Sequence, residues 1–556
     1  MDFSQLNIID GNLFDTIVTS GAAGLKEHLD AVNDLNVFPI PDGDTGDNMF
    51  HTIYGGVAKL GAVEENDIGK KATMLSDGML LNARGNSGVI LSQLFCGISN
   101  GLKHLSSATV KDFANAFSEG VKTAYLAVVQ PVEGTILTVA RESAEYVSSR
   151  IKDGETLIEF FDDILTEMKR SLEHTPELLP VLKEAGVIDS GGAGLYYIID
   201  GMRKAVKGES LSLGENSSSA AKDLDFSLFT ENSVMEYGYC TEFLLQLQTV
   251  KTDVHAFNVQ TIIDYLNTIG DSIVAFKTGT IIKVHVHTLT PYKALEFCQR
   301  FGEFLTVKIE NMTLQHNETI KDKSTEEVAF AKVEKPRKKY GVCTVASGEG
   351  VVNMLKELGA DIVIEGGQTN NPSSEDFIKA FDEINADYIF VLPNNGNIIL
   401  TAKQAASMYK NAEIIVIESK NIGDCYAALS MADFEPETPE EVKNILIDNM
   451  QGVTTGLITT SVRDANLNGV EIKKGNYIGF TDKTMYASSP DKITTLKLLA
   501  EKMGIKNTMF LIAVYGKSVT EEEKTQVKQY ASEFTNLEFY NIDGKQDVYD
   551  FILIFQ

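Results

Sequence analysis

The stretch NVFPIPDGDTGDNM, residues Asn36–Met49, joins an apolar run to closely spaced carboxylates bracketed by prolines and glycines. Asp42 and Asp44 stand one glycine apart, so in an extended backbone both side chains point to the same side. Two neighbouring carboxylates repel each other, and Mg²⁺ relieves that repulsion while keeping positions for phosphate oxygens. Asn36 can supply a further oxygen from the preceding turn. Taken alone, the triplet is also typical of a solvated turn, and its spacing is not that of an EF-hand loop.

Length and composition limit the class of protein. At roughly 100–200 residues per domain, a chain of 556 residues is expected to form three or four domains. Hydrophobic content of 43% and charged content of 23% are typical of a soluble globular protein. The net charge of −29 argues against nucleic acid as a partner, because a phosphate backbone would be repelled. Nucleotides remain compatible with it, since Mg²⁺ bridges carboxylates and phosphates.

Targeting signals and cysteines point to one compartment. The start of the chain, MDFSQLNIIDG, has neither a basic segment nor the apolar segment of a signal peptide. We find no apolar run long enough for a transmembrane segment. The five cysteines are scattered and odd in number, which favours reduced thiols over a disulfide framework. We therefore expect a cytoplasmic protein.

Two polar linkers, Lys207–Asp223 and Asn317–Lys339, divide the chain into three expected domains. Residues 1–207 show helical spacing of apolar residues and predict an all-α helical bundle. Residues 224–317 combine the helix-like HAFNVQTIIDYLNTIG, which we expect to end at Gly270, with the strand-like IIKVHVHT, and predict a small α+β domain. Residues 339–556 alternate strand-like and helix-like segments, which predicts an α/β domain with a parallel sheet.

Three glycine-rich turns precede apolar helices in the first domain. They are NARGNSGVI, Asn82–Ile90; QPVEGTILT, Gln130–Thr138; and VIDSGGAGLYYIIDGM, Val187–Met202. Backbone N–H groups at a helix N-terminus bind anions. Each turn alone is more often a closely packed helix start, but three together with an acidic loop predict a nucleotide bound at helix N-termini. The chain has no G-x-x-x-x-G-K-[ST] motif, so it is not a P-loop enzyme.

These four motifs, in this order and spacing, resemble the nucleotide-binding domain of the dihydroxyacetone kinase family. Over nearly its full length the chain resembles the ATP-binding subunits of bacterial fatty acid kinases, which add a middle domain and a DegV-like C-terminal domain. The resemblance implies that Asp42 and Asp44 hold two Mg²⁺ ions that bridge the ATP phosphates. Asn36 stands nearest the family's third metal-binding acid, which leaves that ligand open. The residues implied to line the nucleotide are Thr45, Gly46, Asn48, Met49, Gly85, Asn86, Ser87, Gly88, Gly134, Thr135, Asp189, Ser190, Gly191 and Gly192.

The resemblance also implies an activity and a partner. The chain would transfer the γ-phosphoryl group of ATP to a fatty acid carboxylate, giving an acyl phosphate for phospholipid synthesis. A separate DegV-like fatty-acid-binding protein would present that acid, and the chain itself would form a homodimer. Two alternatives stay open: a dihydroxyacetone-type subunit that phosphorylates a small polyol, and a non-catalytic scaffold gated by nucleotide.

The middle domain carries a candidate zinc site. His285 and His287 stand two apart on an expected strand, and Cys240 lies on another. One thiolate and two imidazoles are suitable Zn²⁺ ligands. The alternative, a buried thiol and two surface histidines, has equal weight from spacing alone. The resemblance favours a structural Zn²⁺, whereas a hydrolytic role with Glu242 as base has little support.

Overall fold

The computed structural model describes residues 5–36, 43–61, 65–128, 130–209, 211, 213, 239–254, 257–278, 280–311, 337–481 and 484–556. It forms two compact units, one of Met1–Glu215 with Glu334–Gln556 and one of Asn216–Val333. The first unit contains a helical domain and an α/β domain, and the second contains the middle domain. The expected multidomain class, with a helical N-terminal domain and an α/β C-terminal domain, is confirmed.

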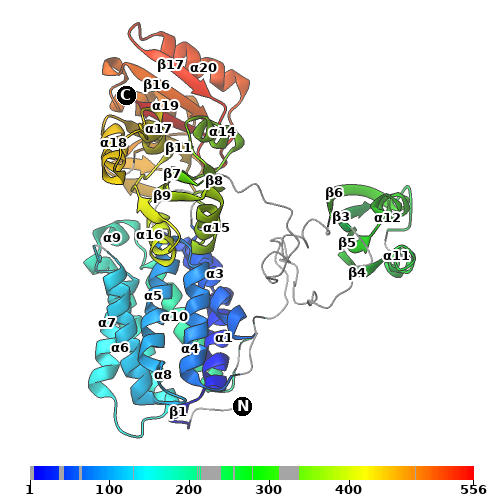
Figure 1. Cartoon of the computed structure of the whole chain (residues 1–556), viewed down its shortest axis with the longest axis vertical. Coiled ribbons are helices and arrows are strands. Elements are labelled where there is room, and N and C mark those ends of the chain that lie inside the picture. Colours follow the sequence, from blue (N-terminus) through cyan, green and yellow to red (C-terminus); the bar gives the residue numbers. More distant parts are fainter. Residues whose placement is uncertain are drawn as a thin grey trace. The chain divides into compact units, whose positions relative to one another are not determined.

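The N-terminal domain is a bundle of helices, drawn in blue to cyan in Figure 1. Side chains that accept hydrogen bonds from first-turn N–H groups set several helix starts. Thr109 and Thr156, for example, each form a reciprocal capping box with the acid three residues later. The helices are α1 Gly11–Glu27, α2 Leu29–Asp34, α3 Thr45–Leu60, α4 Ile68–Asn82, α5 Gly85–Leu102, α6 Val110–Ala127, α7 Ile136–Arg150, α8 Leu157–Leu178, α9 Pro180–Ala185 and α10 Ser190–Val206, with short strands β1 Ile8–Ile9 and β2 Ala108–Thr109.

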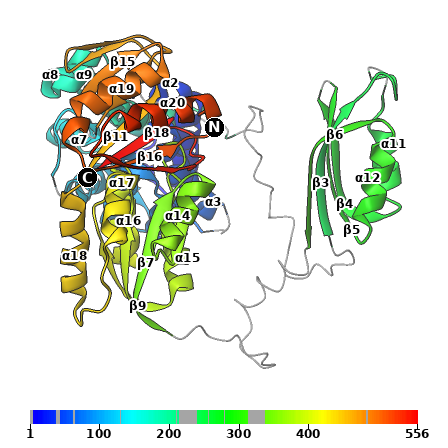
Figure 2. The ribbon, with the colours of Figure 1, turned by 90° about the horizontal axis from the view of Figure 1, so that it is seen from above.

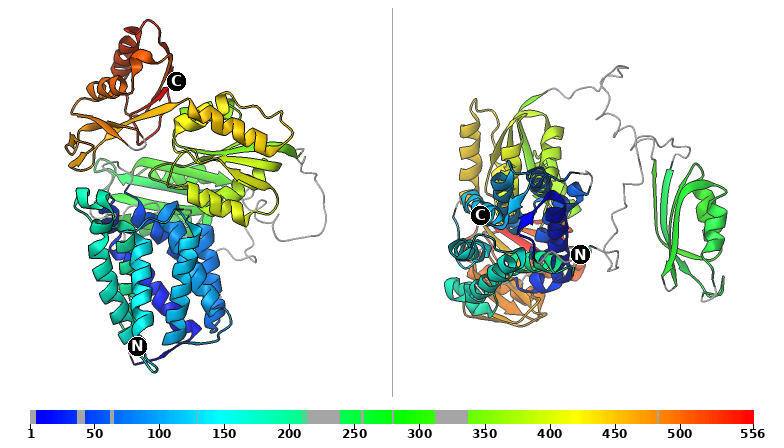
Figure 3. Two further views of the ribbon diagram at one scale, coloured as in Figure 1. Left: turned by 90° about the vertical axis from the view of Figure 1, so that its left-hand side faces the viewer. Right: turned by 90° about the horizontal axis from the view of Figure 1, so that it is seen from below.

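One apolar core holds this bundle together. The long helices run side by side (Figure 3), with α1 against α10, α3 against α4, and α5 against α6. Phe14, Phe160 and Phe161 are almost fully buried in it. Burying each such side chain contributes about 1.5–3 kcal/mol. The helices of the bundle are therefore held in place by one shared core. No helix in the described residues is both long and apolar enough to cross a membrane.

The middle domain is a four-stranded antiparallel sheet with helices on one face (Figure 2). Val284 and Val286 of the sheet and Ile262 and Leu266 of a covering helix are buried in its core. The expected helix ends earlier than predicted, because Gly270 already pairs with Thr288 as the first residue of a strand. The elements are β3 Tyr239–Leu247, α11 Gln260–Leu266, β4 Gly270–Thr278, β5 Ile281–Thr288, α12 Pro291–Cys298 and β6 Gly302–Asn311, in the order β4-β5-β3-β6.

The C-terminal domain contains two larger sheets. The first is parallel, in the order β10-β9-β7-β8, with α15 and α16 on one face and α14, α17 and α18 on the other. Its elements are β7 Lys338–Ala346, α14 Glu349–Glu357, β8 Ile362–Glu365, α15 Ser374–Ile384, β9 Ala386–Leu392, α16 Ile399–Met408, β10 Glu413–Val416, α17 Ile422–Ser430 and α18 Pro439–Gln451.

The second sheet is mostly antiparallel, in the order β15-β14-β11-β18-β16-β17. The helices α19 and α20 pack on this sheet in one apolar core. Its elements are β11 Thr454–Thr460, β14 Tyr477–Phe480, β15 Met485–Ser489, α19 Lys492–Lys502, the 3₁₀ turn η2 Ile505–Asn507, β16 Phe510–Tyr515, α20 Glu521–Ser532, β17 Glu538–Ile542 and β18 Phe551–Phe555, while β12 Ala465–Leu467 and β13 Val470–Ile472 form a separate hairpin.

Candidate nucleotide site

Four helix N-termini, those of α3, α5, α7 and α10, meet at one end of the bundle. The Ser190 hydroxyl at the start of α10 donates to the Thr45 hydroxyl at the start of α3, at 3.3 Å. Asp189 accepts hydrogen bonds from the backbone N–H groups of Gly192 and Ile136, which links α10 to α7. A Cβ atom on Gly85 would lie 2.6 Å from Asn48 Nδ2, so the start of α5 lies against α3. The motifs expected to share a nucleotide are therefore neighbours in space.

Three of these four helices have no side-chain cap from the residue that precedes them. Asp44, Arg84 and Thr135 precede α3, α5 and α7 without capping them. In α3 the Gly46 N–H donates to Asn33 instead, and in α7 the Ile136 N–H donates to Asp189. The other first-turn N–H groups are left for a ligand or water, and the helix dipole favours an anion there. In α10, by contrast, Asp189 caps the helix through the 2.7 Å bond from Gly192. The arrangement suits a polyanion such as a phosphate chain.

The acidic loop is organised by a residue that the sequence did not single out. Asn33 Oδ1 accepts from the backbone N–H of Gly46 at 2.7 Å, and Asn33 Nδ2 donates to Asp47 at 2.8 Å. Asp44, the residue before α3, is only 7% exposed. A nearly buried carboxylate fits a hard divalent cation. Asp42 lies outside the described residues, so its pairing with Asp44 stays a prediction.

Two glycines in the site adopt conformations that other residues avoid. Gly85 has φ of +57° and Gly134 has φ of +83°, both in the left-handed region. A Cβ atom on Gly134 would lie 2.8 Å from Leu179 Cβ. Both turns thus require glycine for backbone reasons as well as for space. Gly191 and Gly192, in contrast, are ordinary helical residues that allow close packing of α10 on Ile136 and Val139.

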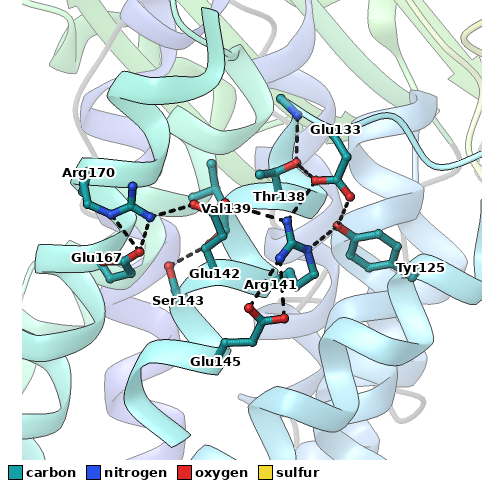
Figure 4. A network of polar contacts seen from close by, with 11 residues as sticks. Tyr125, Glu133, Thr138, Val139, Arg141, Glu142, Ser143, Glu145, Glu167 and Arg170 are labelled. Atoms are coloured by element: carbon teal, nitrogen blue, oxygen red, sulfur yellow. Dashed lines mark hydrogen bonds and ion pairs between the residues drawn. The ribbon is translucent and has the colours of Figure 1, made fainter. Parts of the chain in front are cut away.

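A hydrogen-bond network fixes the loop before α7, as Figure 4 shows. Gly134 N–H donates to the Thr138 hydroxyl at 2.8 Å, and that hydroxyl donates to Glu133 at 2.6 Å. Arg141 donates to Glu133 at 3.0 Å and to Tyr125 of α6 at 3.2 Å. Burial alone would raise the pKa of Glu133, but the bonds from Thr138 and Arg141 lower it below its usual range. The carboxylate therefore stays ionised and holds the loop to its own helix.

Asp189 has a perturbed acidity. Burial raises its pKa to about 6 from 3.8, although the N–H groups of Gly192 and Ile136 act in the opposite direction. The carboxylate lies at the junction of α7 and α10. A negative charge there carries a cost that a nearby cation or hydrogen-bond donor would offset.

The remaining predicted residues differ in their positions. Thr45, Asn86 and Ser87 lie in the first turns of α3 and α5 and keep partial exposure, as does Thr135. Gly88 packs closely on Thr52 of α3, and its N–H is already bonded to the Arg84 carbonyl. Met49 is fully buried and packs on Gly194 beneath the site. Asn36 lies near the acidic loop, since a Cβ atom on Gly43 would be 3.9 Å from Asn36 Cβ. Their roles toward a nucleotide remain predictions.

The C-terminal domain also contributes to the site, through a residue that no sequence motif indicates. Asn371 Nδ2 lies 2.5 Å from Asp44 Oδ2 and 3.4 Å from Asn48 Oδ1. Arg84 Nη1 donates to the Asn371 carbonyl at 3.2 Å. Arg84 and α15 also line an open pocket of about 530 Å³ with both acidic and basic side chains. No local pattern in the segment NNPSS indicates such contacts, because they join residues far apart in the chain.

The candidate zinc residues are described only by their backbone. Cys240 pairs with His287 across β3 and β5, and Glu242 pairs with His285. Their side chains lie outside the described part of the structure. Among the side chains that it does describe, no cluster of three or more histidines, cysteines or acids could hold a metal. Zinc binding by these residues therefore stays a prediction.

The strand ends of the C-terminal parallel sheet enclose little space. Asn394, in the left-handed region at φ of +59°, donates to Thr344 and to the Val345 carbonyl. Together with Gln546 and Tyr549 it lines a cavity of about 50 Å³. Ordinary small-molecule sites hold roughly 300–1,000 Å³. This cavity, lined by both apolar and polar side chains, is smaller than such a site.

Comparisons with known proteins cover the whole chain. Residues 39–204 match the DAK2 domain, 236–319 the FakA-like middle domain and 341–556 the FakA-like C-terminal domain, both named for a subunit of fatty acid kinase. Protein YloV of Bacillus subtilis is 37% identical over 558 residues, 99% of each chain. An uncharacterized protein of Staphylococcus aureus is 36% identical over 552 residues, 98% of this chain and 99% of that protein.

Among solved structures, DegV of Bacillus subtilis, a fatty acid binding protein, covers 39% of this chain and 99% of its own at 13% identity and a TM-score of 0.30. Dihydroxyacetone kinase from C. freundii with AMP-PNP and Mg²⁺ covers 35% of this chain and 34% of its own at 17% identity and a TM-score of 0.29. The full-length sequence matches carry the assignment. This chain belongs to the FakA-like family of fatty acid kinase subunits.

Proposed function

We propose that this chain is the ATP-binding subunit of a fatty acid kinase. It binds ATP with Mg²⁺ and transfers the γ-phosphoryl group to a fatty acid carboxylate held by a separate DegV-like fatty-acid-binding protein. The observation that carries the proposal is the meeting of four helix N-termini beside the buried carboxylate of Asp44. Helix N-termini suit phosphate, and the carboxylate suits the cation that phosphate brings with it.

Each group has a role in the transfer. The first turns of α5 and α7 bind phosphate oxygens, while Asp42 and Asp44 hold Mg²⁺, with Asn36 as a third oxygen donor. When bound there, Mg²⁺ would supply positive charge that offsets the negative charge of the phosphates. The acceptor carboxylate is already ionised near neutral pH, so its oxygen attacks the γ-phosphorus without a general base. The bond from the γ-phosphorus to the β–γ bridging oxygen breaks, and ADP and acyl phosphate leave.

The small C-terminal cavity supports a separate carrier for the acid. A long acyl chain needs a site within or above the usual range of several hundred cubic ångströms, and the cavity beside Asn394 has about 50 Å³. The C-terminal domain would then dock the carrier instead of holding the lipid.

We also propose a structural Zn²⁺ in the middle domain and a homodimeric assembly. Backbone pairing of Cys240 with His287 supports the zinc site, since it brings one sulfur and one nitrogen ligand to opposite positions of neighbouring strands.

The test measures ATP consumption by the full chain with fatty acid and a DegV-like fatty-acid-binding protein. We expect Asp44→Ala to lower turnover at least a hundredfold, because the variant loses a ligand of the Mg²⁺ that would neutralise charge on the transferring phosphate. The matched control is Asp30→Ala, an exposed acid in the same domain, with turnover equal to wild type. Equal turnover in Asp44→Ala and wild type would contradict the site. Faster turnover with dihydroxyacetone and its carrier than with any fatty acid would contradict the acceptor.

A further inference from the structure

The segment before α15 reaches from the C-terminal domain into the candidate nucleotide site. Its residue Asn371 is only 2% exposed. Its Nδ2 donates to Asp44 Oδ2 and lies within 3.4 Å of Asn48 Oδ1. A Cβ atom on Gly85 would stand 3.4 Å from the same nitrogen. One carboxamide thus touches the start of α3 and faces the start of α5.

The backbone around Asn371 is fixed to the helical domain. Ser373 forms an antiparallel bridge with Arg84, and Ser374 N–H donates to the Ala83 carbonyl at 3.3 Å. Arg84 in turn holds the Asn371 carbonyl. Pro372 removes one backbone degree of freedom next to Asn371. The segment that carries the Asn371 side chain is therefore held in place by its backbone contacts, as a positioning residue requires.

A second contact between the two domains braces this segment. Gln404 of α16 is 6% exposed and donates to the Leu80 carbonyl at 2.8 Å and to Ser374 at 3.2 Å. It also accepts from Gln93 of α5 at 2.9 Å. Figure 1 shows α15 and α16 at the ends of the helices on which they pack, α4 and α5. The contact that places Asn371 is thus part of a larger polar interface.

Buried polar atoms without partners gather at this junction. Within the described residues, Asn371 Oδ1, Asn86 Oδ1 and Arg84 Nε are buried and make no hydrogen bond. Buried polar groups in native proteins are nearly always paired, so each such atom needs an explanation. All three atoms lie next to Asp44 or at the start of α5. The two oxygens can accept hydrogen bonds from water on a cation, and the N–H can donate to an anion bound to that cation.

We propose that the C-terminal domain contributes Asn371 to the cation and nucleotide site of the helical domain, as a positioning residue. Its Nδ2 orients the Asp44 carboxylate, and its Oδ1 accepts a hydrogen bond from water on the cation or ligates the cation itself. The inference rests on the proposed function, which requires that cation. It adds that the site is complete only when both domains are in contact.

The test uses the full chain and Mn²⁺ alone as the probe, followed by electron paramagnetic resonance. We expect Asn371→Ala to weaken Mn²⁺ binding about tenfold, a change of about 1.4 kcal/mol. The matched control is Asn370→Ala, whose side chain is exposed one residue earlier, with unchanged Mn²⁺ binding. Equal Mn²⁺ affinity in Asn371→Ala and wild type would overturn the proposal.

Asn371→Asp gives an independent measurement. It replaces a donor beside Asp44 by a like charge, so we expect metal-free protein to melt about 3 °C or more below wild type. Saturating Mn²⁺ should abolish that difference, because the cation bridges both carboxylates. A defect that persists at saturating Mn²⁺ would overturn the proposal even where Asn371→Ala is too unstable to purify.

These readouts separate the inference from the proposed function. Mn²⁺ binding needs no acceptor, so loss of binding in Asn371→Ala supports the inference even if no fatty acid is phosphorylated. Wild-type transfer to a carrier-bound fatty acid with undisturbed Mn²⁺ binding in Asn371→Ala would overturn the inference and leave the function standing.

Discussion

One asparagine shapes the acidic loop at the scale of single residues. Asn33 uses its oxygen to hold Gly46 N–H and its nitrogen to hold Asp47. Asp47 in the first turn of α3 is thereby paired with α2, whereas Asp44, the residue before α3, contacts the C-terminal domain. Two aspartates of one motif thus have different partners.

Asp189→Asn measures the cost of a buried carboxylate. Its folded-state pKa is about 6 against 3.8, so the folded chain binds the proton more tightly than the unfolded chain. The free energy of unfolding therefore falls as pH rises from about 4 through about 6 and stays low above that range. The loss is at most about 3 kcal/mol. Asparagine keeps an acceptor for Gly192 and cannot ionise, so we expect the variant to be more stable than wild type at pH 7.5.

Urea unfolding at several pH values checks this, and the advantage should shrink toward pH 4. Asp491→Asn is the matched control, because Asp491 also caps a helix but has a pKa lowered by its bonds from Thr494. That carboxylate stabilises the fold above its unfolded pKa and loses this effect as pH falls through its folded pKa. Its variant should be the less stable one at neutral pH. A difference in the free energy of unfolding between Asp189→Asn and wild type that stays constant with pH would contradict the raised pKa of Asp189.

At the scale of elements, helix starts carry the candidate site. The turn before α5 combines a positive φ at Gly85 with contact to Asn48, and the turn before α7 combines a positive φ at Gly134 with the Glu133–Arg141 network. Neither helix is capped by the residue before it. Both helices are packed in the apolar core along their length and keep first-turn N–H groups at the end where a ligand would bind.

Gly85→Ala should separate backbone strain from site damage. Alanine at φ of +57° costs about 1–2 kcal/mol. The added Cβ also meets the end of the Asn48 side chain, which can move at little cost but then leaves the site. We expect nucleotide affinity to fall tenfold or more, measured by titration with a non-hydrolysable ATP analogue in Mg²⁺ buffer.

Gly186→Ala is the matched control, because Gly186 has φ of +66° and an added Cβ there would meet no atom within 4 Å beyond its chain neighbours. It should lose similar thermal stability and keep its affinity for the analogue. Equal affinity in the two variants would show that the start of α5 does not contact the nucleotide.

At the scale of the whole molecule, the chain combines two chemically different candidate metal sites. The acidic loop offers oxygen ligands that suit Mg²⁺, and the pair of strands β3 and β5 offers sulfur and nitrogen that suit Zn²⁺. The middle domain has a small core of its own, and small domains gain most from a metal. A zinc ion bound there would serve the stability and self-association of the domain more than chemistry.

Elemental analysis of protein purified without added metal tests the zinc site. We expect one equivalent of Zn²⁺ in wild type and far less in Cys240→Ser. Cys298→Ser is the matched control, because that thiol is buried in the apolar core of the same domain, where burial raises its pKa to about 12. It should keep its zinc. Sedimentation should show a dimer that His287→Ala weakens. Zinc well below one equivalent in wild type, unchanged by Cys240→Ser, would refute the site.

Much of this protein follows from local sequence rules. The helical spacing of apolar residues, the βα alternation after Lys339 and the four glycine-rich or acidic motifs depend on residues close together in the chain, so each predicts its own element. The preference for glycine at Gly85 and Gly134 also follows from local backbone conformation, because both residues have positive φ. The end of α11 was predicted wrongly because the pairing of Gly270 with Thr288 outweighed the local helical pattern. The zinc ligands and the domain boundaries remain predictions.

Only the tertiary structure decided which of these elements complete one another. Asn371 reaches Asp44 across more than three hundred residues, and Gln404 joins α16 to α4 and α5. Neither residue has a periodicity or motif that marks it. Hydrogen bonds between distant segments depend on the packing of whole domains, and that packing is a sum of many weak contacts that no short stretch of sequence contains.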